Sequence, residues 1–182
     1  YLITRTCPAC DGTRLGERVR STLIEGIDLG EASRLTLTEL REWVQRVPGL
    51  VPDEVAPMAR VIVEEMTEPM QRLVELGLSY LSLDRASSTL SNGERQRVQL
   101  ARAVRNRTTG VLYVLDEPSI GLHPANLEGL IGVMHDLLAD GNSIVLVDHD
   151  VQVLREAGWL IEMGPGAGAK GGTLLAQGTV AS

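Results

Sequence analysis

The 182-residue sequence predicts an α/β fold with a largely parallel sheet, preceded by a helical region. Two observations support this prediction. From residue 111 onward, short apolar runs alternate with helix-length segments, as in parallel strands joined by crossover helices. Upstream of these runs, apolar side chains recur at helical spacing. We therefore divide the chain into a knuckle and hairpin at 1–30, a helical subdomain at 31–105 and an α/β subdomain at 106–182.

Residues 1–30 open with two cysteines in a tight turn. Cys7 and Cys10 are two residues apart and Gly12 follows closely, which is the geometry of half a tetrahedral zinc site. A complete site needs two more ligands, and the sequence contains no other cysteine. Two unligated thiols or a redox pair are the alternatives. The stretch 19–24 then alternates between apolar and polar residues, which predicts a short hairpin.

Residues 31–105 begin with a helix start signal. Thr36 and Glu39 have the spacing of a capping box, so a helix should run from about 37 to 47, where Pro48 and Gly49 end it.

A longer helix should follow at roughly 53–76. Pro69 should kink this helix, because proline lacks the N–H that the helix needs, and Gly77 should end it. Its apolar positions at helical spacing are Met58, Ile62, Met66, Leu73 and Leu76.

Residues 106–182 carry the predicted sheet. The continuous apolar runs at 111–116 and 143–148 predict parallel strands that are covered on both faces. Pro124 suits the first turn of a helix that reaches about residue 139. The remaining predicted elements are a short helix at 150–157 and strands at 159–163 and 173–177.

The composition limits the classes of function. A formal net charge of −7 argues against a nucleic-acid surface spread over the whole chain, and 3% aromatic residues argue against a single-strand stacking platform. The basic residues of segment 94–107 predict a solvated helix face, with a patch facing a phosphate or a partner domain as the alternative. No apolar run approaches membrane-spanning length and no signal peptide opens the chain, so we expect a cytoplasmic protein cut from a longer one.

Two acids close the first apolar run. Asp116 ends the predicted strand at the carboxyl edge of the sheet, where α/β folds bind ligands and where a carboxylate can hold Mg²⁺. Glu117 is one residue further, points differently, and can polarise an attacking water. A strand end followed by a helix-capping acid is the structural alternative.

A second candidate site opens the helix that runs to about residue 105. The spacing Ser-x-x-Glu is that of a capping box, and the free N–H groups of a capped helix start can also bind an anion such as a γ-phosphate. These residues are Ser91, Asn92, Gly93 and Glu94.

A histidine follows the second apolar run. His149 can make a local hydrogen bond at the strand end, or it can contact a γ-phosphate and hold the geometry of the attacking water. We expect His123 to cap the next helix or to lie at a subunit contact, and His135 to be structural or exposed to solvent.

The sequence lacks a phosphate-binding loop. Such a loop reads Gly-x-x-x-x-Gly-Lys-Ser/Thr and opens a helix, and the sole lysine is Lys170. In its glycine-rich surroundings Ala169 replaces the second glycine and Gly171 replaces the hydroxyl residue. A strand rather than a helix should follow, so we predict a turn there.

In this order and spacing, the motifs resemble the second half of an ABC-type ATPase module. The chain is similar to the UvrA family of bacterial excision repair, including its paralogues. The similarity lies in segments 7–15, 77–85, the signature at 90–97, the stretch 110–123 and the glycine-rich segment 163–172.

The resemblance implies a P-loop NTPase fold in which the phosphate-binding loop lies far upstream of the signature. It assigns ATP contacts to Ser91, Asn92, Gly93, Glu94 and Asp116, Mg²⁺ to Asp116, and catalysis to Glu117 and His149. It further implies dimerisation, binding of damaged DNA and a UvrB-type partner. Zn²⁺ at Cys7 and Cys10 is a hypothesis from the Cys-x-x-Cys spacing, with its other ligands expected from outside these 182 residues.

Two positions depart from the family pattern. Asn92 stands where the signature usually has glycine, and asparagine tolerates a left-handed backbone better than most residues. Asp148 stands where the common form has glutamate, which indicates a divergent paralogue. An ABC-type ATPase for transport or drug resistance is therefore the rival hypothesis, with a non-catalytic scaffold as a third.

Overall fold

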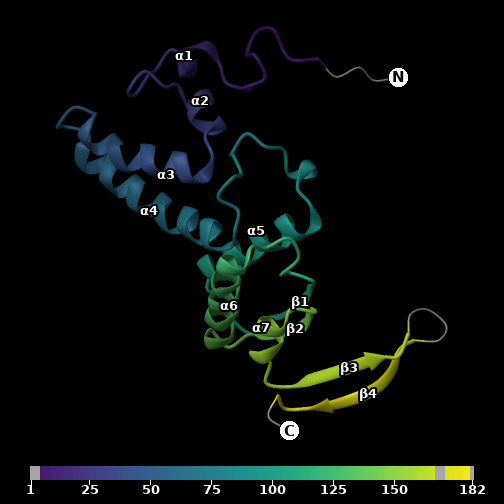
Figure 1. The fold of residues 1–182 in the computed structure, drawn as a ribbon. Helices are drawn as coiled ribbons and strands as arrows, with labels where there is room; N and C mark the ends of the chain where they lie inside the picture. Colours follow the sequence, from purple (N-terminus) through teal and green to yellow (C-terminus); the bar gives the residue numbers. More distant parts are fainter. Residues whose placement is uncertain (1–4, 167–170, 181–182) are drawn as a thin grey trace. The chain divides into compact units, whose positions relative to one another are not determined.

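The computed structural model describes residues 5–166 and 171–180. Within it the chain forms two compact units, Tyr1–Arg105 and Asn106–Ser182. The first is helical, and the second alternates strands with helices (Figure 1). Across the described residues, none of the helices combines the length and the apolar character that a membrane crossing requires.

The first unit consists of helices joined by turns. Two of its helices, α3 and α4, lie side by side and are linked by the turn η1 (Figure 1). The elements are α1 (Glu17–Arg20), α2 (Leu29–Arg34), α3 (Leu37–Arg46), η1 (Val47–Gly49), α4 (Ala56–Glu75), η2 (Ser87–Thr89) and α5 (Asn92–Arg105).

The helix ends of the first unit follow local chemistry. Thr36 and Glu39 form the predicted capping box at the start of α3, with the Glu39 N–H donating to Thr36 Oγ1 at 3.3 Å and the Thr36 N–H donating to Glu39 Oε2 at 2.9 Å. At the end of α4, Gly77 has a φ of 73°, and the Leu78 N–H donates to the Leu73 carbonyl at 3.0 Å. This left-handed glycine closes the helix as predicted.

The predicted hairpin near residue 20 is wrong. Helix α1 covers part of the stretch, and only an isolated antiparallel bridge between Ile24 and Ile27 follows. The Ser21 N–H donates to the Glu17 carbonyl at 2.9 Å. The described part of this unit contains no strand with which residues 19–24 could pair. A lone strand would leave its backbone N–H and C=O groups without partners, whereas a helical turn pairs them locally.

The core of the first unit lies between α3 and its neighbours. Met66 and Leu73 of α4 pack against this core, whereas Met58 and Ile62 on the same helix remain 68% and 47% exposed. The apolar spacing therefore locates the helix, but not all of its apolar positions are covered. The buried core residues are Ala32, Leu37, Leu40, Trp43, Val44, Met70, Leu78 and Leu81.

The second unit is built on a parallel strand pair. β1 (Leu112–Asp116) and β2 (Ser143–Val147) pair in parallel, with Leu112 opposite Ser143, and α6 (Pro124–Ala139) connects them. Gly141, with a φ of 82°, ends α6. The apolar residues of α6 that are buried are Leu127, Leu130, Val133, Met134 and Leu137.

Only one face of the β1–β2 pair is covered. Leu115 on that face is 5% exposed. The other face, which we call the open sheet face, carries four apolar side chains that are 50–67% exposed: Leu112, Val114, Val145 and Val147. The prediction of a sheet covered on both faces is therefore wrong for the described residues, because the chain supplies a covering helix on one side only.

The chain then forms a short helix and a hairpin. α7 (Val151–Arg155) follows β2, and β3 (Leu160–Gly164) pairs antiparallel with β4 (Thr173–Gly178). A strand thus follows the glycine-rich segment, as predicted. Lys170 and Ala169, on which the rejected phosphate-loop comparison depends, lie outside the described residues.

Candidate functional site

The two acids at the end of β1 differ in backbone conformation. Asp116 is the last residue of β1 and is exposed. Glu117 has a φ of 48°, which is uncommon for a residue with a side chain and redirects it from the strand. The Glu117 N–H donates to the Val147 carbonyl at 2.7 Å, so the turn is anchored to β2. Backbone strain of this kind is concentrated at functional sites.

Glu117 lies close to His149, the candidate from the second strand. Their Oε1 and Nδ1 atoms are 4.0 Å apart, and the side chains are 49% and 73% exposed respectively. This separation exceeds a direct hydrogen bond, but one water can contact both groups. The structure thus brings together a carboxylate and an imidazole that are 32 positions apart in the sequence.

Asp148 links the same two strand ends, and its role was not anticipated from the sequence. Its carboxylate accepts hydrogen bonds from Ser119 Oγ at 2.6 Å and from the Ser119 N–H at 3.2 Å. It also accepts the N–H groups of His149 at 2.7 Å and Asp150 at 2.9 Å. Burial raises the pKa of the Asp148 carboxyl, but these hydrogen bonds outweigh burial and leave the pKa below its usual value.

The loop after Glu117 leads into α6. Pro118 and Ser119 are buried, and His123 caps the helix by accepting the Ala125 N–H on Nδ1 at 3.2 Å. The capping alternative for His123 is therefore confirmed. His135 Nε2 lies 3.2 Å from Glu156 Oε2 at the surface, in line with its expected structural or solvent-facing role.

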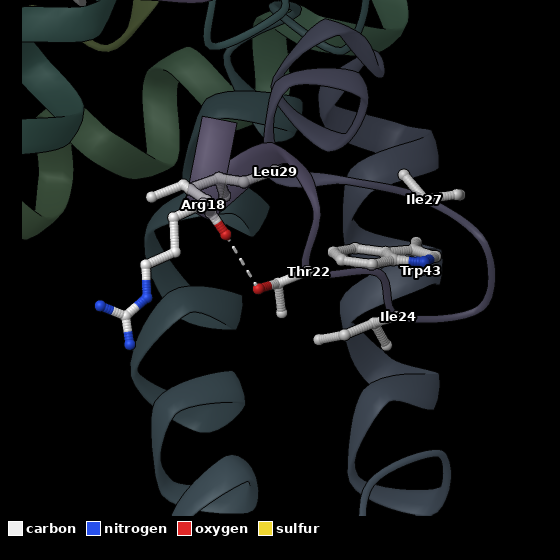
Figure 2. A pocket seen from close by; sticks show the side chains of 7 residues that line it. Arg18, Thr22, Ile24, Ile27, Leu29 and Trp43 are labelled. Atoms are coloured by element: carbon white, nitrogen blue, oxygen red, sulfur yellow. Dashed lines mark hydrogen bonds between the residues drawn. The ribbon is translucent and has the colours of Figure 1, made fainter. Parts of the chain in front are cut away.

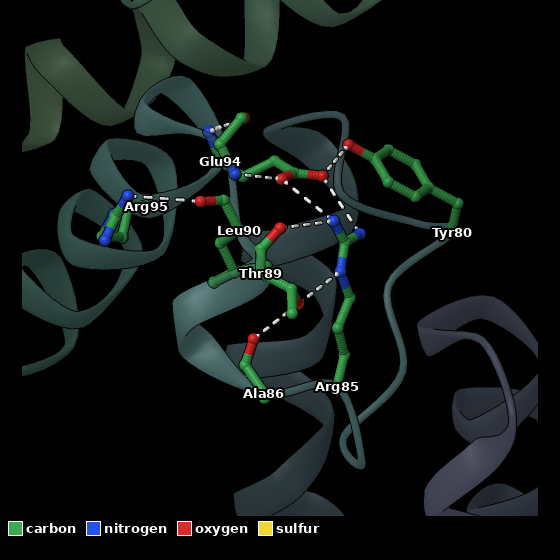
Figure 3. Close-up of polar contacts among 8 residues, drawn as sticks. Tyr80, Arg85, Ala86, Thr89, Leu90, Glu94 and Arg95 are labelled. Atoms are coloured by element: carbon green, nitrogen blue, oxygen red, sulfur yellow. Dashed lines mark hydrogen bonds and ion pairs between the residues drawn. The ribbon is translucent and has the colours of Figure 1, made fainter. Parts of the chain in front are cut away.

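The signature segment, in the first unit, is held by a buried carboxylate. The Glu94 N–H donates to Ser91 Oγ at 3.1 Å, and the Ser91 N–H donates to Glu94 Oε2 at 2.6 Å, which completes the predicted capping box. Glu94 Oε1 also accepts from Tyr80 Oη at 2.7 Å and from Arg85 Nη1 at 3.2 Å (Figure 3).

The four groups that contact Glu94 stabilise its ionised form. The side chain is only 7% exposed. The Tyr80 hydroxyl, followed by the Ser91 backbone, lowers the pKa of Glu94 from 4.5 to about 2. Burial, together with the hydrogen bond to Glu94, raises the pKa of Tyr80. The Glu94 carboxylate thus stabilises the signature turn. A direct contact between Glu94 and ATP stays a prediction.

Asn92 is the first residue of α5 and not a left-handed turn residue. Its φ is not positive, and its Oδ1 accepts from Arg95 Nη2 at 3.2 Å. The replacement of glycine by asparagine therefore requires no special backbone conformation. Along the same helix Arg95, Arg102 and Arg105 are exposed, whereas Arg97 is 4% exposed, so the solvated basic face is interrupted by one buried arginine.

Cys7 and Cys10 form the expected turn. The Asp11 N–H donates to the Cys7 carbonyl at 2.8 Å, and the N–H groups of Ala9 and Cys10 lower the pKa of the exposed Cys7 thiol. A thiolate held in this way fits a soft metal such as Zn²⁺. In the described part of the chain, no cluster of three or more His, Cys, Asp or Glu side chains completes such a site. The two cysteines thus provide half of a ligand set.

A pocket of about 400 Å³ lies beside Trp43 in the first unit (Figure 2). Its walls contain no carboxylate, imidazole or thiol, so it offers no group for metal binding or water activation. The candidate chemistry therefore remains with the turns after β1 and β2 and with the signature segment. The lining residues are Arg18, Val19, Thr22, Ile24, Ile27, Leu29 and Trp43.

Comparison with known proteins agrees with this set of motifs. A family model described as ABC transporter matches residues 19–120, more than half of the chain. The chain belongs to this ABC family. It is 46% identical to UvrABC system protein A of Thermus thermophilus over 180 residues and 41% identical to that of Aquifex aeolicus. These alignments cover 99% of this chain and 19% of each relative.

A solved structure gives the same result for the ABC fold. The crystal structure of UvrA2 from Deinococcus radiodurans matches 95% of this chain and 22% of that chain, with a TM-score of 0.82 and 39% sequence identity. The resemblance to the UvrA family, indicated by the motifs, is confirmed, and so is the ABC-type fold. The chain spans about a fifth of the length of these relatives.

Proposed function

We propose that this chain is the signature and Walker B part of an ATP-binding and ATP-hydrolysing module in a UvrA-type protein, which recognises damaged DNA in nucleotide excision repair. The observation that supports it most directly is the 4.0 Å approach of Glu117 to His149 at the carboxyl ends of adjacent parallel strands. The similarity to UvrABC system protein A along 99% of the chain connects this geometry with repair.

The chemistry follows from the positions of the side chains. Glu117, exposed and close to an imidazole, accepts a proton from a water and orients it toward the γ-phosphorus of ATP. His149 contacts the γ-phosphate and limits the directions that this water can take. Asp116, the exposed carboxylate at the end of β1, would hold Mg²⁺, and the ion would neutralise charge on the phosphates.

The signature segment supplies a second set of contacts to ATP. Ser91, Asn92 and Gly93 present the start of the 14-residue helix α5, where free N–H groups and the helix dipole attract an anion. Glu94 stabilises this turn through its hydrogen bonds with Tyr80 and Arg85. We assign Glu94 this indirect part in nucleotide binding.

A further segment of the protein supplies the phosphate-binding loop and covers the open sheet face. Two features support this part of the proposal. The sequence has a single lysine, Lys170, in a segment that a strand follows. The open sheet face carries four exposed apolar side chains of the kind that a complete ABC sheet would cover.

The partners and the zinc ion follow from the same proposal. We assign a homodimer, damaged DNA and a UvrB-type partner to the whole protein, in the cytoplasm, and Zn²⁺ to Cys7 and Cys10 with two further ligands from elsewhere. The rival function, ATP hydrolysis for transport or drug resistance, has less support. The similarity to UvrA proteins covers nearly the whole chain, from the Cys-x-x-Cys turn to β4.

The deciding experiment compares DNA dependence in the full-length protein. We expect it to bind a duplex that carries a lesion more tightly than the intact duplex, and we expect DNA to change its rate of ATP hydrolysis. The 182-residue chain alone should hydrolyse no ATP. The rival function would be supported instead if DNA did not change the rate of ATP hydrolysis and the full-length protein bound damaged and intact duplexes equally.

A further inference from the structure

Asp148 joins two loops that are far apart in the sequence. Ser119, 29 residues upstream, donates to it through both its hydroxyl and its backbone N–H, at 2.6 and 3.2 Å. On the other side, the carboxylate accepts the N–H groups of the two residues that follow it, at 2.7 and 2.9 Å. Four donated hydrogen bonds therefore converge on a single side chain at the end of β2.

The loops that Asp148 joins carry the two candidate catalytic side chains. Ser119 is two residues after Glu117, and His149 directly follows Asp148. The Glu117 N–H bonds to the Val147 carbonyl at 2.7 Å, so the backbone is tied to β2 immediately before and after Pro118. These two ties set how Glu117 faces His149.

The backbone at Glu117 needs such a restraint. A φ of 48° is unfavourable for a residue with a side chain and persists only where the surroundings enforce it. Glu117 is half exposed and His149 is mostly exposed, so side-chain packing restrains them only weakly. The restraint must come from the backbone and from the contacts of Ser119.

We infer that Asp148 is a positioning residue for ATP hydrolysis: its carboxylate locks the Ser119 turn to the end of β2, so that Glu117 and His149 face the same water. The inference rests on the proposed function of this site. Asp148 itself contacts neither nucleotide nor water in this role and acts only through Glu117 and His149.

The role depends on a carboxylate and not only on its shape. Oδ1 accepts three hydrogen bonds, and Oδ2 accepts the Ser119 N–H. An asparagine placed in the same way would direct its NH₂ group at the Ser119 N–H, so that two donors would face each other. Asp148→Asn therefore breaks the tie while it preserves the volume of the side chain.

The test measures ATP hydrolysis by the full-length protein in two backgrounds. Asp148→Asn should lower kcat by about 10- to 100-fold, the range expected for a small misplacement of a catalytic group, and should leave ATP affinity nearly unchanged. In a Glu117→Gln background the same substitution should lower kcat by less than about twofold, because residues that act as a unit are not additive. Asp140→Asn, at the end of α6, is the matched control and should leave kcat unchanged.

Each outcome bears on the inference. An equal loss in both backgrounds would mean that Asp148 merely supports folding, and unchanged hydrolysis would overturn its role altogether. If Asp148→Asn does not fold, Ser119→Ala, which removes only one hydroxyl donor, replaces it, with an expected loss of about threefold to tenfold in the parent background and less than about twofold in the Glu117→Gln background. Unchanged kcat or equal losses for Ser119→Ala would likewise overturn the inference. A normal rate for Glu117→Gln itself would instead overturn the proposed function of the site.

Discussion

Glu94 and Glu117 each belong to a family motif, yet their surroundings are opposite. Glu94 is buried, accepts hydrogen bonds from Tyr80, Arg85 and the Ser91 backbone, and has a pKa of about 2. Glu117 is half exposed, lies on a strained backbone, and has a histidine 4.0 Å away. An acid whose oxygens are all occupied stabilises a fold, whereas an acid with free oxygens and an anchored backbone can act on a substrate.

The largest effect should come from the exposed acid. Glu117→Gln in the full-length protein should slow ATP hydrolysis by about 100-fold or more, because the amide cannot accept a proton from water. ATP binding, measured at equilibrium, should change little. Unchanged turnover would reduce Glu117 to a residue that only ends the strand.

The same substitution at the buried acid should affect stability instead. Glu94→Gln leaves donors of Tyr80, Arg85 and Ser91 without a full charged partner, at a cost of about 2 kcal/mol in the free energy of unfolding. Urea unfolding of the 182-residue chain measures this change. Glu117→Gln is the control and should stay within about 0.5 kcal/mol of the parent. Equal stability of the two variants would remove the contrast between the acids.

The pH dependence of unfolding should show the same contrast. The pKa of Glu94 is lowered in the folded chain from 4.5 to about 2, so its contribution is fully present above pH 4.5 and is lost as the pH falls toward 2. The parent chain should therefore lose stability faster than Glu94→Gln over this interval. Urea midpoints of both proteins at several acidic pH values test this prediction. If the midpoints of the parent and of Glu94→Gln fall equally with pH, the prediction is wrong.

A second, exposed capping box shows how much of the stabilisation by Glu94 depends on its burial and how much on the cap itself. Glu39 caps α3 through Thr36 as Glu94 caps α5 through Ser91, and the Thr36 backbone, followed by its hydroxyl, lowers the pKa of Glu39, but this residue is exposed. Glu39→Gln should shift the urea midpoint by clearly less than Glu94→Gln does. Similar shifts would show that the cap alone, and not the buried network, accounts for the effect at Glu94.

The smallest effect concerns the cysteines, of which Cys7 is exposed like Glu117, and which provide only half of a zinc ligand set. The isolated chain should retain little zinc after dialysis, because structural zinc sites are four-coordinate. The full-length protein should retain it, and Cys7→Ser should lower that content. Metal analysis of both proteins decides the point. One tightly held zinc per isolated chain would reveal additional ligands within these 182 residues.

Local signals predicted the helices and strands well. The capping box at Thr36, the glycine at 77 and the two apolar runs each act through neighbours within a few residues, so their consequences are visible in the sequence. The hairpin expected near residue 20 failed because alternation alone does not provide a partner strand.

The residues of the candidate site could be proposed from the sequence, but their contacts could not. Asp116, Glu117 and His149 were found from their places after apolar runs. The network of Glu94 depends on Tyr80, 14 residues away, and that of Asp148 on Ser119, 29 residues away. The fold brings such pairs together, and no spacing rule in the sequence predicts them.

The open sheet face has a consequence for how the isolated chain behaves at high concentration. Among the described residues β1 and β2 form a sheet of two strands, and the exposed face of this pair carries four apolar side chains: Leu112, Val114, Val145 and Val147. Unpaired strand edges beside an apolar surface are templates for aggregation, which a net charge of −7 opposes only by long-range repulsion. Added salt, by screening that repulsion, should bring on self-association of the 182-residue chain.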